Sequence, residues 1–212
     1  MSHTLGIRQA QKQKTRQALL DAALQLLEEQ SLSSLGLREV TRAVGVAPTA
    51  FYRHFRDMAD LGVALVEEAL SSLHTTLVSL LAATGDSADS DGEERIAATV
   101  ELIVAYVRTH PAHVRFIARE QHGGVQAVRS AIGDQLTLFA QEVKAQFARE
   151  PESAGWDDDD LLMLARMYVD HMVMTASALL EAAPDAEERV AASARRQLRL
   201  VSLGRRHWLD GQ

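Results

Sequence analysis

Cysteine is absent from this chain of 212 residues, so disulfide bonds, thiolate metal ligands and cysteine nucleophiles are excluded. No apolar run approaches the roughly 20 residues that a membrane-spanning helix needs. The segment from Met1 to Gln17 is polar and basic and lacks the apolar core of a secretory signal peptide. These absences predict a cytoplasmic protein.

Several signatures of enzymes are also missing. The chain has no pair of Glu-x-x-His units for a di-iron centre, no glycine-rich phosphate loop and no nucleophile elbow. His110 and His113 lie three residues apart but lack acidic partners at metal-ligand spacing. We therefore expect no catalytic residues, no metal and no cofactor.

Two acidic segments are better explained without a metal ion. Residues 84–94 contain three aspartates, but their spacing does not fit a calcium-binding loop, so a flexible acidic linker is expected. The four aspartates at 157–160 stand where a helix begins, and there they complement the positive end of its dipole.

Charge is distributed unevenly along the chain. The net charge is −7, yet residues 1–60 carry eight Lys or Arg against six Asp or Glu. The remainder carries 14 basic and 23 acidic residues, and residues 1–20 carry four basic and no acidic ones. An acidic body with one basic end favours a localised anionic partner, and repulsion by the body would help orient it.

Apolar residues recur every three or four positions through most of the chain, which predicts an all-α protein of about nine helices. Residues 1–7 are expected to be loose. The expected helices cover residues 8–30, 37–44, 48–55, 57–83, 96–108, 111–121, 125–149, 161–180 and 185–209.

The segment 37–55, LREVTRAVGVAPTAFYRHF, predicts two short helices joined by a tight turn. Gly45 stands where the first helix must end and can take the left-handed conformation at low cost. Pro48 suits the first turn of the second helix, and Phe51 and Phe55 are expected to face inward. This is the pattern of a helix-turn-helix, whose second helix fits the major groove of DNA.

The outward face of this segment is typical of a nucleic-acid contact. Thr49, Tyr52, Arg53 and His54 are expected to point outward, and no acidic residue lies between Thr41 and Arg56. The basic side chains at the start of the first helix would clamp the DNA backbone: Arg8, Lys12, Lys14 and Arg16. The alternatives are an ordinary helical hairpin and a solvated, frayed helix start.

The last two helices are expected to form a dimer. Residues 161–180 are apolar nearly all round, so that helix should be buried on several sides. The last helix has an apolar stripe with small neighbours, and two helices from each of two chains would form a four-helix interface. The stripe consists of Val190, Ala194, Leu198, Val201 and Trp208.

The middle helices contain aromatic and methionine residues that could line an adaptable apolar cavity or simply form the core. They are Tyr106, Phe116, Phe139, Met163, Met167, Tyr168 and Met172. His171 is either a core or interface residue or a ligand contact. Arg115, Arg119 and Arg129 could receive an anionic head group, or could pair with Glu120 or Asp134 at the surface.

The segment LREVTRAVGVAPTAFYRHFRD resembles the DNA-binding signature of the TetR family of bacterial transcription regulators. That resemblance implies a DNA-binding domain at 1–56 and a ligand-binding and dimerisation domain at 57–212. It also implies phosphate contacts from Lys12, Lys14 and Arg16 and contacts near the bases from Arg38, Thr49, Ala50, Tyr52, Arg53 and His54. Two positions depart from the family pattern, since Ala47 replaces a hydroxyl cap and Met58 replaces a lysine.

More narrowly, APTAFYRHFRDMADLG and HPAHVRFIAREQHGG are similar to segments of the FabR/DesT group. That similarity implies a repressor of fatty acid desaturation or unsaturated fatty acid synthesis that senses long-chain acyl-CoA. The ligand contacts are expected from the residues of the middle helices: Tyr106, Phe116, Arg119, Phe139, Met163, Met167, Tyr168 and His171. The alternative is a TetR-type repressor that responds to another hydrophobic molecule, and a helical interaction module without a DNA role is more distant.

Overall fold

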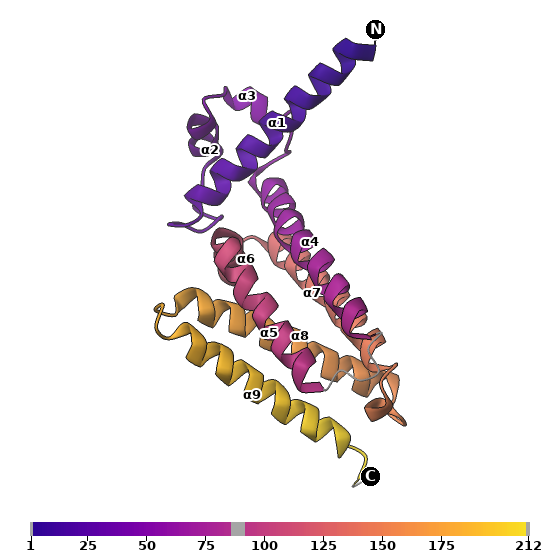
Figure 1. Cartoon of the computed structure of the whole chain (residues 1–212). Coiled ribbons are helices and arrows are strands. Elements are labelled where there is room, and N and C mark those ends of the chain that lie inside the picture. Colours follow the sequence, from indigo (N-terminus) through magenta and orange to yellow (C-terminus); the bar gives the residue numbers. More distant parts are fainter. Residues whose placement is uncertain (1, 86–91, 211–212) are drawn as a thin grey trace. The chain divides into compact units, whose positions relative to one another are not determined.

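The computed structural model describes residues 2–85 and 92–210, and these residues form nine α-helices and one 3-10 turn, with no strand among them (Figure 1). The expected all-α class is confirmed. The helices are α1 (Ser2–Leu26), α2 (Leu37–Val44), α3 (Pro48–Phe51), α4 (Met58–Gly85), α5 (Gly92–Thr109), α6 (Pro111–Glu120), α7 (Gln126–Phe147), α8 (Asp158–Glu181) and α9 (Glu187–Arg206), with the turn η1 (Pro151–Ser153) before α8.

Several boundaries differ from the expected ones. The first helix begins at Ser2, so residues 2–7, which were expected to be loose, are helical, and it ends at Leu26 rather than near Gln30. The helix α3 ends at Phe51 rather than near Phe55, and α8 begins at Asp158 rather than at Leu161. The helix α5 begins at Gly92, so it takes the last residues of the expected linker. The rest of that linker, residues 86–91, lies outside the part of the chain that the structure describes.

The chain divides into two compact units. The first consists of Met1–Ala69 and Arg115–Ile132, and the second of Leu70–Val114 and Gly133–Gln212. The predicted head at 1–56 lies in the first unit, which also takes the end of α6 and the start of α7. The helices α4, α6 and α7 each contribute residues to both units.

The first unit has its own apolar core, in which α1 packs against α2 and α2 against α3. The helix α4 approaches closely at Gly62, where an added Cβ would lie 2.4 Å from Leu32 Cδ2 and 2.7 Å from Val128 Cγ2. Glycine therefore lets α4 reach the loop after α1. The buried core includes Leu19, Leu20, Ala23, Leu27, Leu32, Val40, Phe51, Phe55, Leu61 and Leu65.

The second unit is built on three mutually packed helices, α5, α8 and α9 (Figure 1). One cluster joins Val100 of α5 to Ala191, Ala194 and Leu198 of α9. A second cluster consists of Ile103, Val107, Val114 and Leu179. Part of the α9 stripe that was expected to meet a partner chain is therefore used inside its own subunit, because Ala194 and Leu198 are buried against α5.

A buried ion pair fixes the end of α9. Arg205 donates to the Glu150 carboxylate at 2.6 Å and to the Phe147 carbonyl at 3.2 Å, and its guanidinium lies 4.7 Å from the Phe147 ring centroid. The Ser153 hydroxyl accepts further hydrogen bonds from the same group. Since both charged side chains are almost fully buried, each needs the other to offset its loss of hydration.

Among the described helices, none combines the length and the apolar character required to cross a bilayer.

Candidate functional site

The turn between α2 and α3 has the geometry that the sequence predicted. Gly45 adopts φ 73° and ψ 29°, and its N–H donates to the Arg42 carbonyl at 3.1 Å. Val46 N–H donates to the Thr41 carbonyl at 3.0 Å, which satisfies another carbonyl at the helix end. The helix α3 then starts at Pro48, and Ala47 before it makes no side-chain cap. A tight left-handed turn between two short helices is therefore present.

The residues after Pro48 present one apolar and one polar face. Phe51 and Phe55 are buried, and their ring centroids lie 5.4 Å apart. Tyr52 is 64% exposed, and Thr49 and Arg53 are also exposed, whereas Ala50 is half-buried. The backbone continues as turns to Phe55, whose N–H donates to the Phe51 carbonyl at 3.0 Å. The buried phenylalanines thus fix a short element that carries Tyr52 outward.

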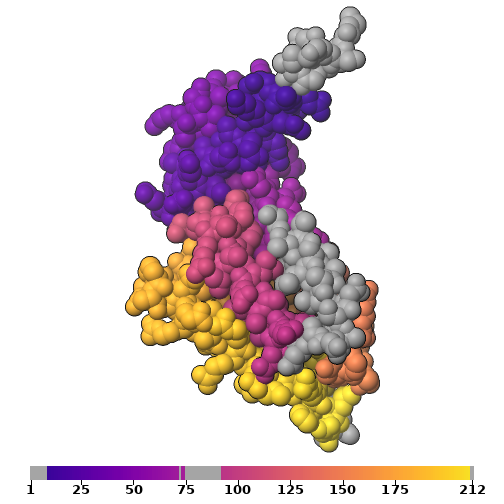
Figure 2. Space-filling model, viewed as in Figure 1, coloured from indigo at the N-terminus to yellow at the C-terminus, as the bar shows by residue number. Residues whose placement is uncertain are grey.

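Basic side chains lie on the same unit. Lys12 and Lys14 are exposed on α1, and Arg38 is exposed in the first turn of α2. Arg16 is half-buried, because its guanidinium lies 4.5 Å from the centroid of the Phe55 ring. Figure 2 shows the side chains of α1 to α3 at the surface of this unit, in indigo to purple. The exposed cations can meet phosphate without first breaking a packed contact.

His54 lies among these cations. Burial, followed by the charges of Lys12, Arg16 and Arg53, lowers the pKa of His54 below 6.5. The buried Nδ1 atom of this imidazole has no hydrogen-bond partner among the described residues. A nearby anion would favour the protonated imidazole and would so raise its pKa.

The residues expected to contact an effector fall into both units. The second unit holds six of them, and three of these make ring contacts with neighbouring side chains. Tyr106 stacks on His110 with ring centroids 4.7 Å apart, and Phe139 stacks on His74 at 5.4 Å. Tyr168 meets Phe147 edge to face at 5.0 Å. Burial raises the pKa of both Tyr106 and Tyr168 to about 12, so both phenols are neutral near pH 7.

The methionines of α8 have a different environment from the expected one. Met163 and Met167 are 40% and 48% exposed, so they lie on the outer face of the helix rather than in the core. Met174 continues the same face one helical repeat later and is also exposed. In the single chain, α8 therefore leaves these three large apolar side chains exposed, beside the exposed Arg166 and Asp170.

Phe116 and Arg119 belong to the first unit, where Phe116 is buried. Arg119 was expected to receive an anionic head group, but its guanidinium donates to the carbonyls of Leu27 and Gln30, each at 2.7 Å. Arg115 pairs with Glu28 at 3.6 Å. The Gly123 carbonyl accepts a hydrogen bond from Arg129, so all three candidate arginines have protein partners.

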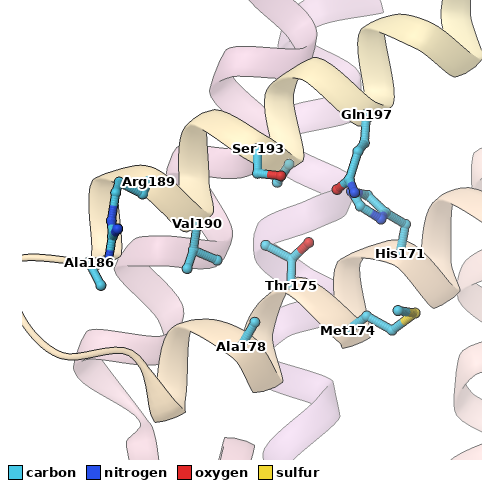
Figure 3. A pocket seen from close by; sticks show the side chains of 10 residues that line it. His171, Met174, Thr175, Ala178, Ala186, Arg189, Val190, Ser193 and Gln197 are labelled. Carbon is cyan, nitrogen blue, oxygen red and sulfur yellow. The ribbon is translucent and has the colours of Figure 1, made fainter.

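An open groove lies between α8 and α9 of the second unit and has a volume of about 450 Å³ (Figure 3). The imidazole of His171 points toward the side chain of Gln197 in this view. The buried Nε2 atom of His171 has no hydrogen-bond partner in the described part of the chain. The residues that line the groove are His171, Met174, Thr175, Ala178, Ala186, Arg189, Val190, Ser193, Ala194 and Gln197.

Sequence reasoning identified only part of this groove. The expected α9 stripe included Val190 and Ala194, with Ser193 as a small neighbour, but missed Gln197, because its position relative to α8 depends on how the two helices pack. The sequence does contain a signal for the polar side of the groove. Arg189, Ser193 and Gln197 are spaced four apart, each one residue before a member of the apolar stripe, so they lie along one side of α9.

The aspartates at the start of α8 serve as a cap and as hydrogen-bond and ion-pair partners. Asp157 accepts a hydrogen bond from the Asp160 N–H at 2.8 Å, and Lys144 donates to Asp158 at 2.7 Å. The indole N–H of Trp208 donates to Asp160 at 2.9 Å. Among the side chains that the structure describes, no three acidic or histidine residues are grouped as a metal ion would require.

A helix-turn-helix near the N-terminus of an otherwise all-helical chain is the pattern of a DNA-binding protein. Residues 19–65 match the profile of the family described as "Bacterial regulatory proteins, tetR family". This part of the chain is therefore similar to TetR-family regulators, and the chain has a TetR-like fold. Members of this family are regulatory proteins rather than enzymes.

A Haemophilus influenzae protein, described as an uncharacterized HTH-type transcriptional regulator, is 40% identical over 139 residues. The match covers 65% of this chain and 65% of that relative, so the chain spans 65% of the relative's length.

Solved structures share the fold. FadR from Bacillus subtilis, in complex with stearoyl-CoA, has a TM-score of 0.68 at 14% identity, over 87% of this chain and 96% of that chain. The regulatory protein TetR from Rhodobacter sphaeroides has a TM-score of 0.59 at 24% identity, over 85% and 96%. AibR, in complex with isovaleryl coenzyme A and operator DNA, has a TM-score of 0.62 at 14% identity, over 85% and 95%.

Proposed function

We propose that this protein is a DNA-binding transcriptional repressor of TetR type whose operator affinity is modulated by long-chain acyl-CoA. Its targets in this proposal are genes of fatty acid desaturation or unsaturated fatty acid synthesis. The observation that carries the DNA-binding part is the geometry of residues 48–55, which we call the recognition turn. Its buried Phe51 and Phe55 fix the backbone while Tyr52 is 64% exposed beside Thr49 and Arg53.

The head is suited to two kinds of DNA contact. Lys12 and Lys14 are exposed on α1 and would bind phosphates, which supplies affinity for any sequence. Tyr52, Thr49 and Arg53 would lie in the major groove and would supply sequence preference. A single short helix makes few contacts, so two heads on a palindromic operator are needed for tight binding.

The outer face of α8 and α9 would supply that second head by pairing two chains. Met163, Met167 and Met174 on α8 and Leu200 on α9 are exposed large apolar side chains. Side chains of both helices reach the surface in Figure 2, in orange and yellow. Covering them with the same face of a second chain would form a four-helix interface with two-fold symmetry.

The effector part rests on sequence similarity and on two structural relatives. The FadR and AibR structures hold stearoyl-CoA and isovaleryl coenzyme A, and both share the fold of this chain. The second unit offers partly buried apolar side chains, among them Tyr106, Val104 and Met172, against which an acyl chain could pack. An effector acts only through a difference in affinity between two conformations of the protein.

The proposal is tested by operator binding with and without effector. Operators are selected from a pool of random duplexes, and saturated and unsaturated long-chain acyl-CoA are then titrated against the complex. We expect at least one chain type to change operator affinity by about 5- to 150-fold, the usual range for allosteric coupling. If no acyl-CoA changes the affinity while a different apolar molecule does, the protein senses another hydrophobic ligand.

A chain that prefers no duplex sequence would refute the regulator proposal itself. Binding to random duplex at low salt is the matched control, since the exposed lysines predict affinity that falls steeply with salt. A protein with neither sequence preference nor salt-dependent binding would be a helical interaction module.

A further inference from the structure

Arg119 and Glu120, the last two residues of α6, form hydrogen bonds with the backbone of the connection between α1 and α2. Arg119 donates to the carbonyls of Leu27 and Gln30 at 2.7 Å and to that of Glu28 at 3.3 Å. These carbonyls follow the last residue of α1, where a helix leaves oxygen atoms without partners. A guanidinium placed there supplies the missing donors and also complements the negative end of the helix dipole.

Glu120 binds the same connection as a hydrogen-bond acceptor, whereas Arg119 binds it as a donor. Its Oε1 atom accepts the Leu32 N–H at 2.8 Å, and the residue is only 1% exposed. Its Oε2 atom is buried and has no hydrogen-bond partner in the described part of the chain. Gly123 leaves room for this carboxylate, because an added Cβ would lie 2.2 Å from Oε2.

We propose that Arg119 and Glu120 are positioning residues that form a two-sided latch, which holds the α1–α2 connection and thereby sets the orientation of the recognition turn. The latch deepens the proposed function, on which it rests. Arg119 and Glu120 would contact neither DNA nor effector, but would hold the folded head in the conformation that reads DNA.

A chain of hydrogen bonds runs from the latch to α2. The Gln30 carbonyl is held by Arg119, and the Gln30 side chain donates to the Glu39 carboxylate at 3.3 Å. The other oxygen of Glu39 accepts the Gly36 N–H at 3.0 Å, at the start of α2. The helix α2 packs in turn against α3, which begins the recognition turn.

The latch also fixes the apolar side of the connection. The Leu32 N–H is bound by Glu120, and the Leu32 side chain fills the space that Gly62 leaves on α4. Holding this amide therefore holds a buried anchor of the head as well. The hydrogen bond from Arg119 to the Leu27 carbonyl and the one from the Leu32 N–H to Glu120 involve backbone atoms only five residues apart.

Small movements would break the latch. A movement of α6 by about 1 Å away from these partners would lengthen contacts of 2.7–2.8 Å to beyond hydrogen-bond range. Donor and acceptor would then be lost together, because the two side chains are adjacent on one helix. Since the first residues of α6, Pro111–Val114, belong to the second unit, a change in that unit can be passed along this helix.

Four variants separate positioning from simple stabilisation. Arg119→Met and Glu120→Met remove the donor and the acceptor while keeping apolar bulk. Glu120→Gln keeps an oxygen that can accept the Leu32 N–H and serves as the conservative rescue. Arg115→Met is the matched control, since Arg115 lies one turn earlier on α6 and makes only a 3.6 Å pair with Glu28.

The readout is the ratio of operator affinity to random-duplex affinity, measured at a temperature where each variant is folded. We expect both removing variants to lower the ratio at least about tenfold, while random-duplex affinity and its salt slope change less than about twofold. Arg115→Met and Glu120→Gln should keep the wild-type ratio. If the removing variants melt earlier but keep the ratio, the latch proposal is overturned.

If Arg119→Met does not fold, Arg119→Lys is measured in its place, because an ammonium lacks the planar fork that spans two carbonyls. A wild-type protein without operator preference counts against the proposed function, and the latch is then judged from amide hydrogen exchange. The Leu32 amide should exchange at least about tenfold faster in Glu120→Met than in Glu120→Gln, with core amides unchanged. Equal exchange rates would overturn the latch.

Discussion

The guanidinium of Arg16 lies 4.5 Å from the centroid of the Phe55 ring, which joins α1 to the end of the recognition turn. The contact gives Arg16 a structural role besides any contact with phosphate. It also means that the basic residues of α1 differ among themselves, since Lys12 and Lys14 are exposed. Substituting Lys12 or Lys14 therefore tests phosphate binding without also removing a packing contact.

Tyr52→Ala and Lys12→Ala should weaken DNA binding in different ways. Loss of Tyr52 should reduce operator affinity by about 1–3 kcal/mol and leave random-duplex affinity nearly unchanged, because it removes a contact near the bases. Loss of Lys12 should weaken binding to all duplexes and lower the salt slope by about one. Fluorescence anisotropy over a series of salt concentrations measures both. Equal losses on operator and random duplex for Tyr52→Ala would contradict its assignment to base reading.

DNA binding should strengthen as the pH is lowered from alkaline values through the pKa of His54 in the complex. In the free protein the pKa of His54 lies below 6.5, through burial and the charges of Lys12, Arg16 and Arg53, so the imidazole is neutral at pH 7. Phosphate nearby would raise that pKa, and binding would then take up a proton. Random-duplex affinity measured against pH at constant salt tests this, and His54→Gln should remove this part of the pH dependence.

The same group predicts the direction of a stability change. Because the pKa of His54 is lower in the folded than in the unfolded protein, the unfolded chain binds more protons below pH 6.5. The free energy of unfolding therefore decreases as the pH falls from 6.5 through the pKa of His54 in the folded protein. Urea denaturation at several pH values should show a smaller acid loss for His54→Gln, and an equal loss would argue against the shift.

Met167→Glu should separate the proposed dimer. Met167 and Leu138 are both 48% exposed, but Met167 lies on the α8 face and Leu138 lies on α7. A carboxylate at Met167 would be buried and unpaired in a four-helix interface, whereas one at Leu138 would stay in water. Sedimentation equilibrium should show monomers for Met167→Glu and dimers for Leu138→Glu. Dimers in both variants would place the interface elsewhere.

Two glycine substitutions should have opposite effects on stability. Gly45→Ala places a Cβ at φ 73° in otherwise open space and should lower stability by about 1–2 kcal/mol through backbone strain. Gly133→Ala lies within α7, also with open space around it, and should raise stability by about 0.5–1 kcal/mol. Urea denaturation checks both. Similar effects at the two sites would show that the left-handed turn is not required.

Arg205→Met should be the most destabilising of the substitutions considered for the second unit. It would leave Glu150 buried with only Arg95 at 3.5 Å, and removing one partner of such a pair costs about 3–5 kcal/mol. Arg206→Met is the matched control, since its 3.7 Å pair with Glu152 is more exposed and should contribute at most about 1 kcal/mol. Replacing Arg205 and Glu150 together by methionine should cost less than Arg205→Met alone.

Local chemistry explains which parts of the fold could be predicted from the sequence. Gly45 and Pro48 are boundary residues whose conformations depend on a few neighbours, and both predictions are confirmed. The start of α4 is likewise fixed locally, because Asp57 accepts a hydrogen bond from the Asp60 N–H at 2.8 Å. The inward positions of Phe51 and Phe55 follow from helical spacing and are confirmed as well.

The contacts of Arg119 and Glu120 could not be predicted in this way. Their partners lie about 90 residues earlier in the chain, and periodicity within α6 carries no information on a distant backbone carbonyl or amide. The exposure of Met163 and Met167 was missed for another reason. A helix that is apolar nearly all round does not indicate which side remains uncovered. The roles of these methionines in effector binding stay a prediction.

The grip of Arg119 on main-chain oxygens has a consequence for engineering. Because the acceptors are carbonyls of residues 27–30, the junction constrains the path of the backbone and leaves the side chains at its surface free to vary. A DNA-reading module from another repressor could therefore be grafted here if it reproduces that path and supplies an amide at the place of Leu32. The compatibility of chimeras would be decided by loop shape more than by loop composition.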